Sequence, residues 1–131
     1  IKAKIWFYQS LAREDISTTR KKGMIKQLEN AMRWRPKSHN GPILIAHSDI
    51  KVTGQAIKIA KKRFKGILGA YPNRGHYEKP HWKFVDNITP NEYLENARLW
   101  IKDGVNIVGG CCGVGVEEIK AISVLKNKQH T

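Results

Sequence analysis

The chain has 131 residues, enough for one modest domain with a hydrophobic core and too few for most two-domain arrangements. Hydrophobic residues make up 40% and charged residues 27%, as in globular proteins, and no apolar run approaches the roughly 18 residues of a membrane span. The first ten residues contain no apolar signal-peptide core. We therefore expect a cytoplasmic protein with no membrane partner.

The net charge of +13 at first suggests a partner with many phosphates. Lysine and arginine, however, occur in nearly every segment, including 20–22 and 61–65, and no nucleic-acid-binding motif accompanies them. This distribution favours a lysine-rich surface in contact with water over a dedicated polyanion site. We expect no nucleic-acid partner.

Short apolar runs alternate with amphipathic patterns along the chain. In chain order, the expected elements are a strand at 3–8, a helix at 17–34, a strand at 41–47, a helix at 49–64, a strand at 67–71, a helix from 89 to 104, a strand at 105–108 and a helix at 116–126. The segment 72–88 contains prolines and a glycine that prevent one continuous element, so we expect a long functional loop there.

The start of the third helix has the clearest local signal. Thr89 suits the N-cap, Pro90 the first helical position and Glu92 the third. Four alternations of strand and helix predict an α/β fold with a parallel sheet, either doubly wound or a (β/α)8 barrel. Because a closed barrel needs eight strands, the barrel alternative means that residues 1–131 form a single partial domain of about four βα units.

Both cysteines of the chain, Cys111 and Cys112, lie in the sequence GGCCG between a strand and a helix. In α/β folds, ligands bind at this edge of the sheet. The simplest alternative is two small buried side chains in a tight turn. The flanking glycines instead permit both sulfurs to converge on one ion, and zinc suits thiolates. A third ligand would then come from another strand end.

The motifs here resemble those of the homocysteine S-methyltransferase family. The resemblance extends over about 41–125 and rests on GVNIVGGCCGVGVEEIKAI at 104–122, YPNRG at 71–75, Trp82, TPNEY at 89–93 and Trp100. It implies the C-terminal half of a (β/α)8 TIM barrel. It also implies methyl transfer to homocysteine or a similar thiol from a methyl donor, with methionine as the product and methionine biosynthesis as the setting.

The family holds Zn²⁺ with three cysteines, so the resemblance implies that Cys111 and Cys112 are metal ligands. It also implies that Tyr71 and Asn73 line the substrate site. The family's third cysteine follows an Asn at the end of the strand that here reads ILIAHSD. At that place the chain has His47, a competent ligand, and Ser48, which is nearest the cysteine position but a poor ligand. In a regular strand the His47 side chain would point to the opposite face, unless the strand has already ended.

A second interpretation is a catalytically inactive half-barrel that acts as a basic binding or oligomerisation module. Four βα units contain part of a zinc site and lack the residues that the family uses in its first four strands. An open half-barrel also has two unpaired strand edges, so we expect self-association through them.

Overall fold

The computed structural model describes residues 7–10, 41–78, 80, 83–85 and 88–126, together with single helical positions at 26, 30 and 33. The rest of the helix expected at 17–34 lies outside the described residues. So does the expected strand at 3–8, apart from its last two residues.

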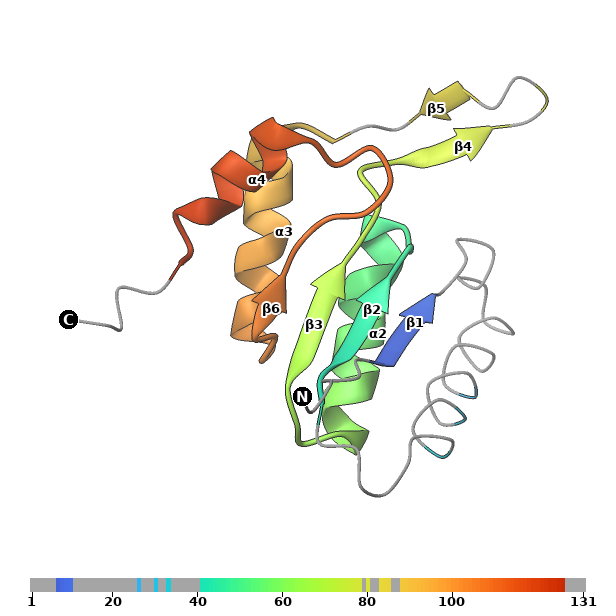
Figure 1. Cartoon of the computed structure of the whole chain (residues 1–131), viewed down its shortest axis with the longest axis vertical. Coiled ribbons are helices and arrows are strands. Elements are labelled where there is room, and N and C mark those ends of the chain that lie inside the picture. Colours follow the sequence, from blue (N-terminus) through green and yellow to red (C-terminus); the bar gives the residue numbers. More distant parts are fainter. Residues whose placement is uncertain are drawn as a thin grey trace, which may run out of the picture.

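Four parallel strands form the main sheet (Figure 1): β1 (Phe7–Ser10), β2 (Ile43–Ala46), β3 (Leu68–Tyr71) and β6 (Ile107–Val108). Their spatial order is β1-β2-β3-β6, which is also their order along the chain. A doubly wound sheet reverses its strand order at a switch point, whereas a barrel adds each new strand on the same side. The observed order is therefore that of a barrel segment.

In the part of the chain that the structure describes, the helices that connect the strands cover one face of this sheet (Figure 1). Helix α2 (Ile50–Arg63) links β2 to β3 and helix α3 (Pro90–Lys102) links β3 to β6, and both lie behind the sheet in Figure 1. Helix α4 (Val116–Ser123) follows β6 and packs against α3. The expected α/β fold with parallel βα units is confirmed, and the one-sided covering is that of a partial (β/α) barrel.

Local sequence explains where the helices begin. The Asp49 carboxylate accepts a hydrogen bond from the Lys51 N–H at 2.8 Å, which caps α2. At α3, the Thr89 hydroxyl accepts from the Glu92 N–H at 3.2 Å, and the Glu92 carboxylate accepts from the Thr89 N–H at 2.7 Å. The hydrogen bond that the Thr89 N–H donates to the Glu92 carboxylate lowers the pKa of Glu92. This capping box is confirmed, and Gly104, with φ of +100°, follows the end of α3 as expected.

The hydrophobic core lies between the sheet and the helices. Trp100 and Tyr93 of α3 are its largest members, with 2% and 0% of their surfaces exposed. Their rings meet edge to face, with centroids 6.0 Å apart. The rest of this core comes from both strands and helices: Ile43, Ile45, Ile50, Val52, Ala56, Ile57, Ala60, Phe64, Leu68, Ala70, Ala97, Val105 and Ile122. It anchors the strand ends on which the site is built.

The segment between β3 and α3, which we expected to be a long loop, contains two strands. It contains an antiparallel hairpin of β4 (His76–Glu78) and β5 (Lys83–Val85), which extends beyond the end of the main sheet (Figure 1). Pro80 lies in the turn between these strands and does not interrupt them. Among the described helices, none has the length and apolar character required to cross a membrane.

Candidate metal centre

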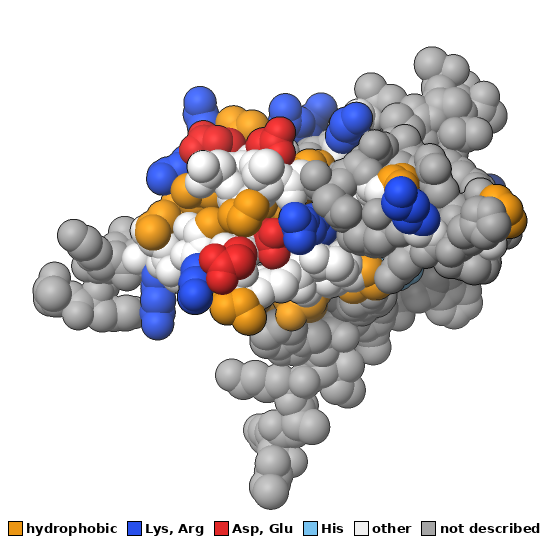
Figure 2. All heavy atoms as spheres, turned by 90° about the horizontal axis from the view of Figure 1, so that it is seen from above, with side chains coloured by type: hydrophobic (Ala, Val, Ile, Leu, Met, Phe, Trp, Pro, Cys, Tyr) orange, Lys and Arg blue, Asp and Glu red, His pale blue; other side chains and the backbone are white. Residues whose placement is uncertain are grey.

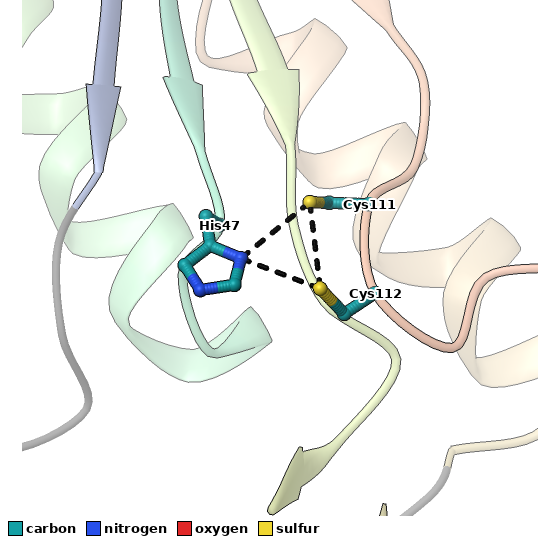
Figure 3. A group of neighbouring side chains, drawn as sticks. All are labelled: His47, Cys111 and Cys112. Atoms are coloured by element: carbon teal, nitrogen blue, oxygen red, sulfur yellow. Dashed lines mark hydrogen bonds between the residues drawn. The ribbon is translucent and has the colours of Figure 1, made fainter.

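Three side chains that can bind a metal meet at the carboxyl ends of β2 and β6 (Figure 3). His47 directly follows β2, and Cys111 and Cys112 follow β6. The Nδ1 atom of His47 lies 3.6 Å from the Cys111 sulfur and 3.4 Å from the Cys112 sulfur, and the two sulfurs are 3.9 Å apart. Among the described residues, this is the group of His, Cys, Asp and Glu side chains compact enough to surround one ion.

The backbone of His47 explains why its ring faces the cysteines. Strand β2 ends at Ala46, and His47 has φ of +50°, in the left-handed region that histidine enters more readily than most residues. The strand alternation therefore no longer controls the direction of its side chain. The His47 N–H still donates to the Tyr71 carbonyl at 3.1 Å, which fixes this turn to the end of β3.

Ser48, the other candidate for the third ligand, has a different environment. Its side chain is buried, with 1% exposed, and its hydroxyl donates to the Ala46 carbonyl at 2.8 Å. Its own carbonyl accepts from the Asn73 N–H at 2.9 Å. The structure thus brings His47 together with the two sulfurs and uses the Ser48 hydroxyl within its own turn.

The glycines of GGCCG are required by close packing. A Cβ atom on Gly109 would overlap the Tyr71 ring, and one on Gly110 would overlap the Val114 side chain. Gly113 has φ of +75°, which glycine adopts without strain. The two cysteines therefore stand on a backbone that turns sharply and approaches its neighbours closely.

Hydrogen bonds from the segment after β3 fix the backbone of both cysteines. The Cys111 N–H donates to the Pro72 carbonyl at 2.8 Å. The Cys112 N–H donates to the Asn73 side-chain oxygen at 3.1 Å, and the Cys112 carbonyl accepts from the Arg74 N–H at 2.9 Å. Asn73, expected to line the substrate site, thus already has a contact within the protein. Tyr71, the other expected lining residue, has 39% of its surface exposed beside Gly109.

Tyr93, for which the sequence predicts no part in the site, supports the same loop from the core. Its hydroxyl donates to the Gly109 carbonyl at 2.6 Å. Burial, with a smaller contribution from the negative charge of Glu118, raises the pKa of Tyr93 well above its ordinary value, so this hydroxyl stays protonated. The spacing of Tyr93, Ala97 and Trp100 along α3 was the available signal, because these residues share one helix face.

Both cysteines are free thiols and partly buried. Burial, followed by the hydrogen bond with Cys111, raises the pKa of the Cys112 thiol. Cys112 is therefore a neutral thiol near pH 7. Thiol ligands give up this proton when a metal binds.

The separations between the three donor atoms can be compared with a tetrahedral zinc ion. Zn–S bonds of about 2.3 Å and Zn–N bonds of about 2.0 Å at tetrahedral angles place two sulfurs about 3.8 Å apart and a sulfur and nitrogen about 3.5 Å apart. The observed values of 3.9 Å, 3.6 Å and 3.4 Å agree with this arrangement. Two thiols and one imidazole also form a donor set that zinc accepts, so the residues present fit the ion.

A parallel sheet with helices on one face, and with two thiols and an imidazole at its carboxyl edge, defines a (β/α) barrel segment that carries a candidate metal centre. Comparison with known families identifies which kind of barrel it is. A model described as homocysteine S-methyltransferase matches residues 4–125, and the chain belongs to that family.

Individual relatives are similar over a shorter part of the chain. Homocysteine S-methyltransferase 2 of Zea mays is 32% identical over 80 residues, which cover 59% of this chain and 23% of the relative. Selenocysteine Se-methyltransferase of Brassica oleracea var. italica is 32% identical over 74 residues, which cover 54% of this chain and 21% of that relative. Homocysteine S-methyltransferase 2 of Arabidopsis thaliana is 31% identical over 74 residues, which cover 54% of this chain and 22% of that relative. The matched part spans less than a quarter of each relative.

Proposed function

We propose that this chain provides the metal-binding, C-terminal half of a thiol methyltransferase barrel, with Cys111, Cys112 and His47 as the ligands of a zinc ion. Family membership supports methyl transfer to a thiol. The observation that carries the proposal is the convergence of two sulfurs and one imidazole nitrogen within 4.8 Å of one another at the edge of the sheet where barrels bind their ligands. The proposed domain includes the whole chain, residues 1–131.

A bound zinc ion would act as a Lewis acid, which lowers the pKa of a coordinated substrate thiol toward neutral pH. The acceptor is homocysteine or a similar thiol, and the name of one relative extends the class to a selenol. In this proposal the acceptor thiol loses its proton to water, and its sulfur forms a bond to the methyl carbon as the bond between that carbon and the rest of the donor breaks. Homocysteine thus becomes methionine, and the demethylated donor leaves with the electron pair of the broken bond. In this proposal the exposed Tyr71 ring forms one wall beside the acceptor, and Asn73 holds the Cys112 backbone in place.

Replacing His47 by alanine tests the third ligand. Loss of the imidazole leaves two thiolates, so we expect His47→Ala to weaken zinc binding by more than about 100-fold, measured by competition with a chromophoric chelator. His47→Cys, which introduces a thiolate at this strand end, should retain zinc. Ser48→Ala is the matched control and should bind like the wild type, because its hydroxyl donates to a backbone carbonyl. Unchanged binding in His47→Ala would remove His47 from the site.

The alternative function is a catalytically inactive half-barrel that acts as an oligomerisation module, and one surface favours it. Strand β6 pairs with β3 and ends the order of the described sheet. Beside it lies a groove of about 680 Å³ whose apolar lining comes from Ile101, Val105, Val108, Ile119, Ile122 and Leu125. Ile119 and Ile101 are 45% and 41% exposed, so apolar surface is available there for a second copy.

Light scattering combined with gel filtration tests this alternative. We expect a dimer at micromolar concentration for the wild type, and a monomer with unchanged circular dichroism for Ile119→Asp, which places a charge in the groove. A wild-type monomer across this range would exclude the oligomerisation module. Figure 2 shows acidic and apolar side chains among the Lys and Arg side chains of the face that it presents.

A further inference from the structure

A buried charged side chain next to the cysteine loop requires an explanation. Glu118, on α4, has 2% of its surface exposed. Among the described residues, it is the one acidic or basic residue that is buried. One carboxylate oxygen accepts from the Gly115 N–H at 2.8 Å, which caps the start of α4. The other lies 3.3 Å from Nε of Arg74. A buried carboxylate is unfavourable unless it is paired and hydrogen-bonded, and Glu118 has both kinds of partner.

Capping alone does not account for this burial, and α3 provides the internal comparison. Glu92 has the same position in α3 as Glu118 has in α4, and its carboxylate also accepts from the backbone N–H three residues earlier. Yet the Glu92 side chain is exposed to solvent while it caps α3. The burial of Glu118 is therefore associated with its second partner, Arg74.

Arg74 joins Glu118 to the cysteine backbone. Its N–H donates to the Cys112 carbonyl at 2.9 Å, and its Nε donates to the Ile88 carbonyl at 3.0 Å. These contacts form a closed ring. The Cys112 carbonyl accepts a hydrogen bond from the Arg74 N–H, and the Arg74 side chain pairs with Glu118. The Glu118 carboxylate accepts from the N–H of Gly115, three residues after Cys112. The turn inside this ring contains Gly113, with φ of +75°, and one hydrogen bond of its own, from the Val114 N–H to the Cys111 carbonyl at 3.2 Å.

From these contacts we infer that the Arg74–Glu118 ion pair positions Cys111 and Cys112 for metal binding. Both residues act through the backbone and do not bind the ion, so they are positioning residues. The part of this inference that concerns metal rests on the proposed function, whereas the part that concerns the backbone of 109–115 does not. The two parts are tested separately.

The backbone part is tested on the metal-free protein by hydrogen exchange. Glu118→Gln keeps an oxygen for the Gly115 N–H and removes the charge that faces Arg74, and Arg74→Met keeps the length of the side chain and removes its charge. We expect both variants to exchange the amides of 109–115 at least about tenfold faster, while those of α2 stay protected. Glu92→Gln is the matched control and should leave this segment unchanged. Unchanged exchange in 109–115, or an equal increase throughout the chain, would overturn the inference.

The metal part is tested by zinc affinity and by the visible absorption of bound Co²⁺. Residues that orient ligands typically change metal affinity by about 10- to 100-fold, and we expect a loss in this range for Glu118→Gln and Arg74→Met, with altered Co²⁺ bands, and none for Glu92→Gln. Wild-type affinity and spectra in both variants would contradict a positioning role. A wild-type chain that binds no zinc would contradict the proposed function instead, and the exchange result would still decide whether the pair holds the loop.

Discussion

Replacing Cys112 by serine is expected to abolish zinc retention and to leave most of the secondary structure intact. The Cys112 sulfur lies 3.4 Å from His47 Nδ1 and 3.9 Å from the Cys111 sulfur, so its removal leaves a gap in the donor set that a serine hydroxyl fills poorly. The residue is only partly buried and lies in a loop outside the hydrophobic core, so the fold should survive. Elemental analysis under reducing conditions measures the zinc, and circular dichroism measures the fold.

The same experiment needs a double variant and the wild type beside it. Wild-type protein should carry about one zinc per chain, and Cys111→Ser combined with Cys112→Ser should carry none. Zinc retained in Cys112→Ser would remove Cys112 from the site. A wild-type chain without zinc would contradict the proposed function.

The features that the sequence predicted well depend on neighbours along the chain. The capping box of α3 involves residues three apart, so Thr89, Pro90 and Glu92 were sufficient to place its start. The cysteine pair likewise lies where an apolar strand meets a glycine turn, and that position alone indicates the functional edge of a parallel sheet. Helix α4 was expected to run to residue 126 and ends at Ser123, a difference typical of helix ends.

The features that the sequence left open depend on contacts between distant segments. Whether His47 faces the sulfurs is decided by its positive φ, which no local pattern specified. Asn73 and Cys112 are 39 positions apart in the sequence, so the hydrogen bond between them forms only when β3 and β6 are paired. The pairing of buried Glu118 with Arg74 could not be predicted for the same reason, since the sequence showed only an acidic residue in the first turn of a helix.

Trp100→Ala is the substitution in the core with the largest expected effect on stability. The side chain is 2% exposed, packs edge to face on Tyr93, and lies over Gly54 of α2, where a Cβ atom would be 3.6 Å from the indole nitrogen. Truncation of a buried aromatic residue costs about 3–5 kcal/mol, a large part of the roughly 5–15 kcal/mol that stabilises a typical domain. Urea unfolding followed by circular dichroism should therefore show a much lower midpoint.

Leu99→Ala is the matched control for this effect, because Leu99 is the neighbouring residue on α3 and 59% of its surface is exposed. We expect it to change the free energy of unfolding by less than about 0.5 kcal/mol. If Trp100→Ala does not fold, Trp100→Phe should give an intermediate loss, since it keeps an aromatic ring against Tyr93. Equal stabilities of the Leu99 and Trp100 variants would contradict the packing of α3 on α2. The loop that Tyr93 holds at Gly109 would then lack its support from the core.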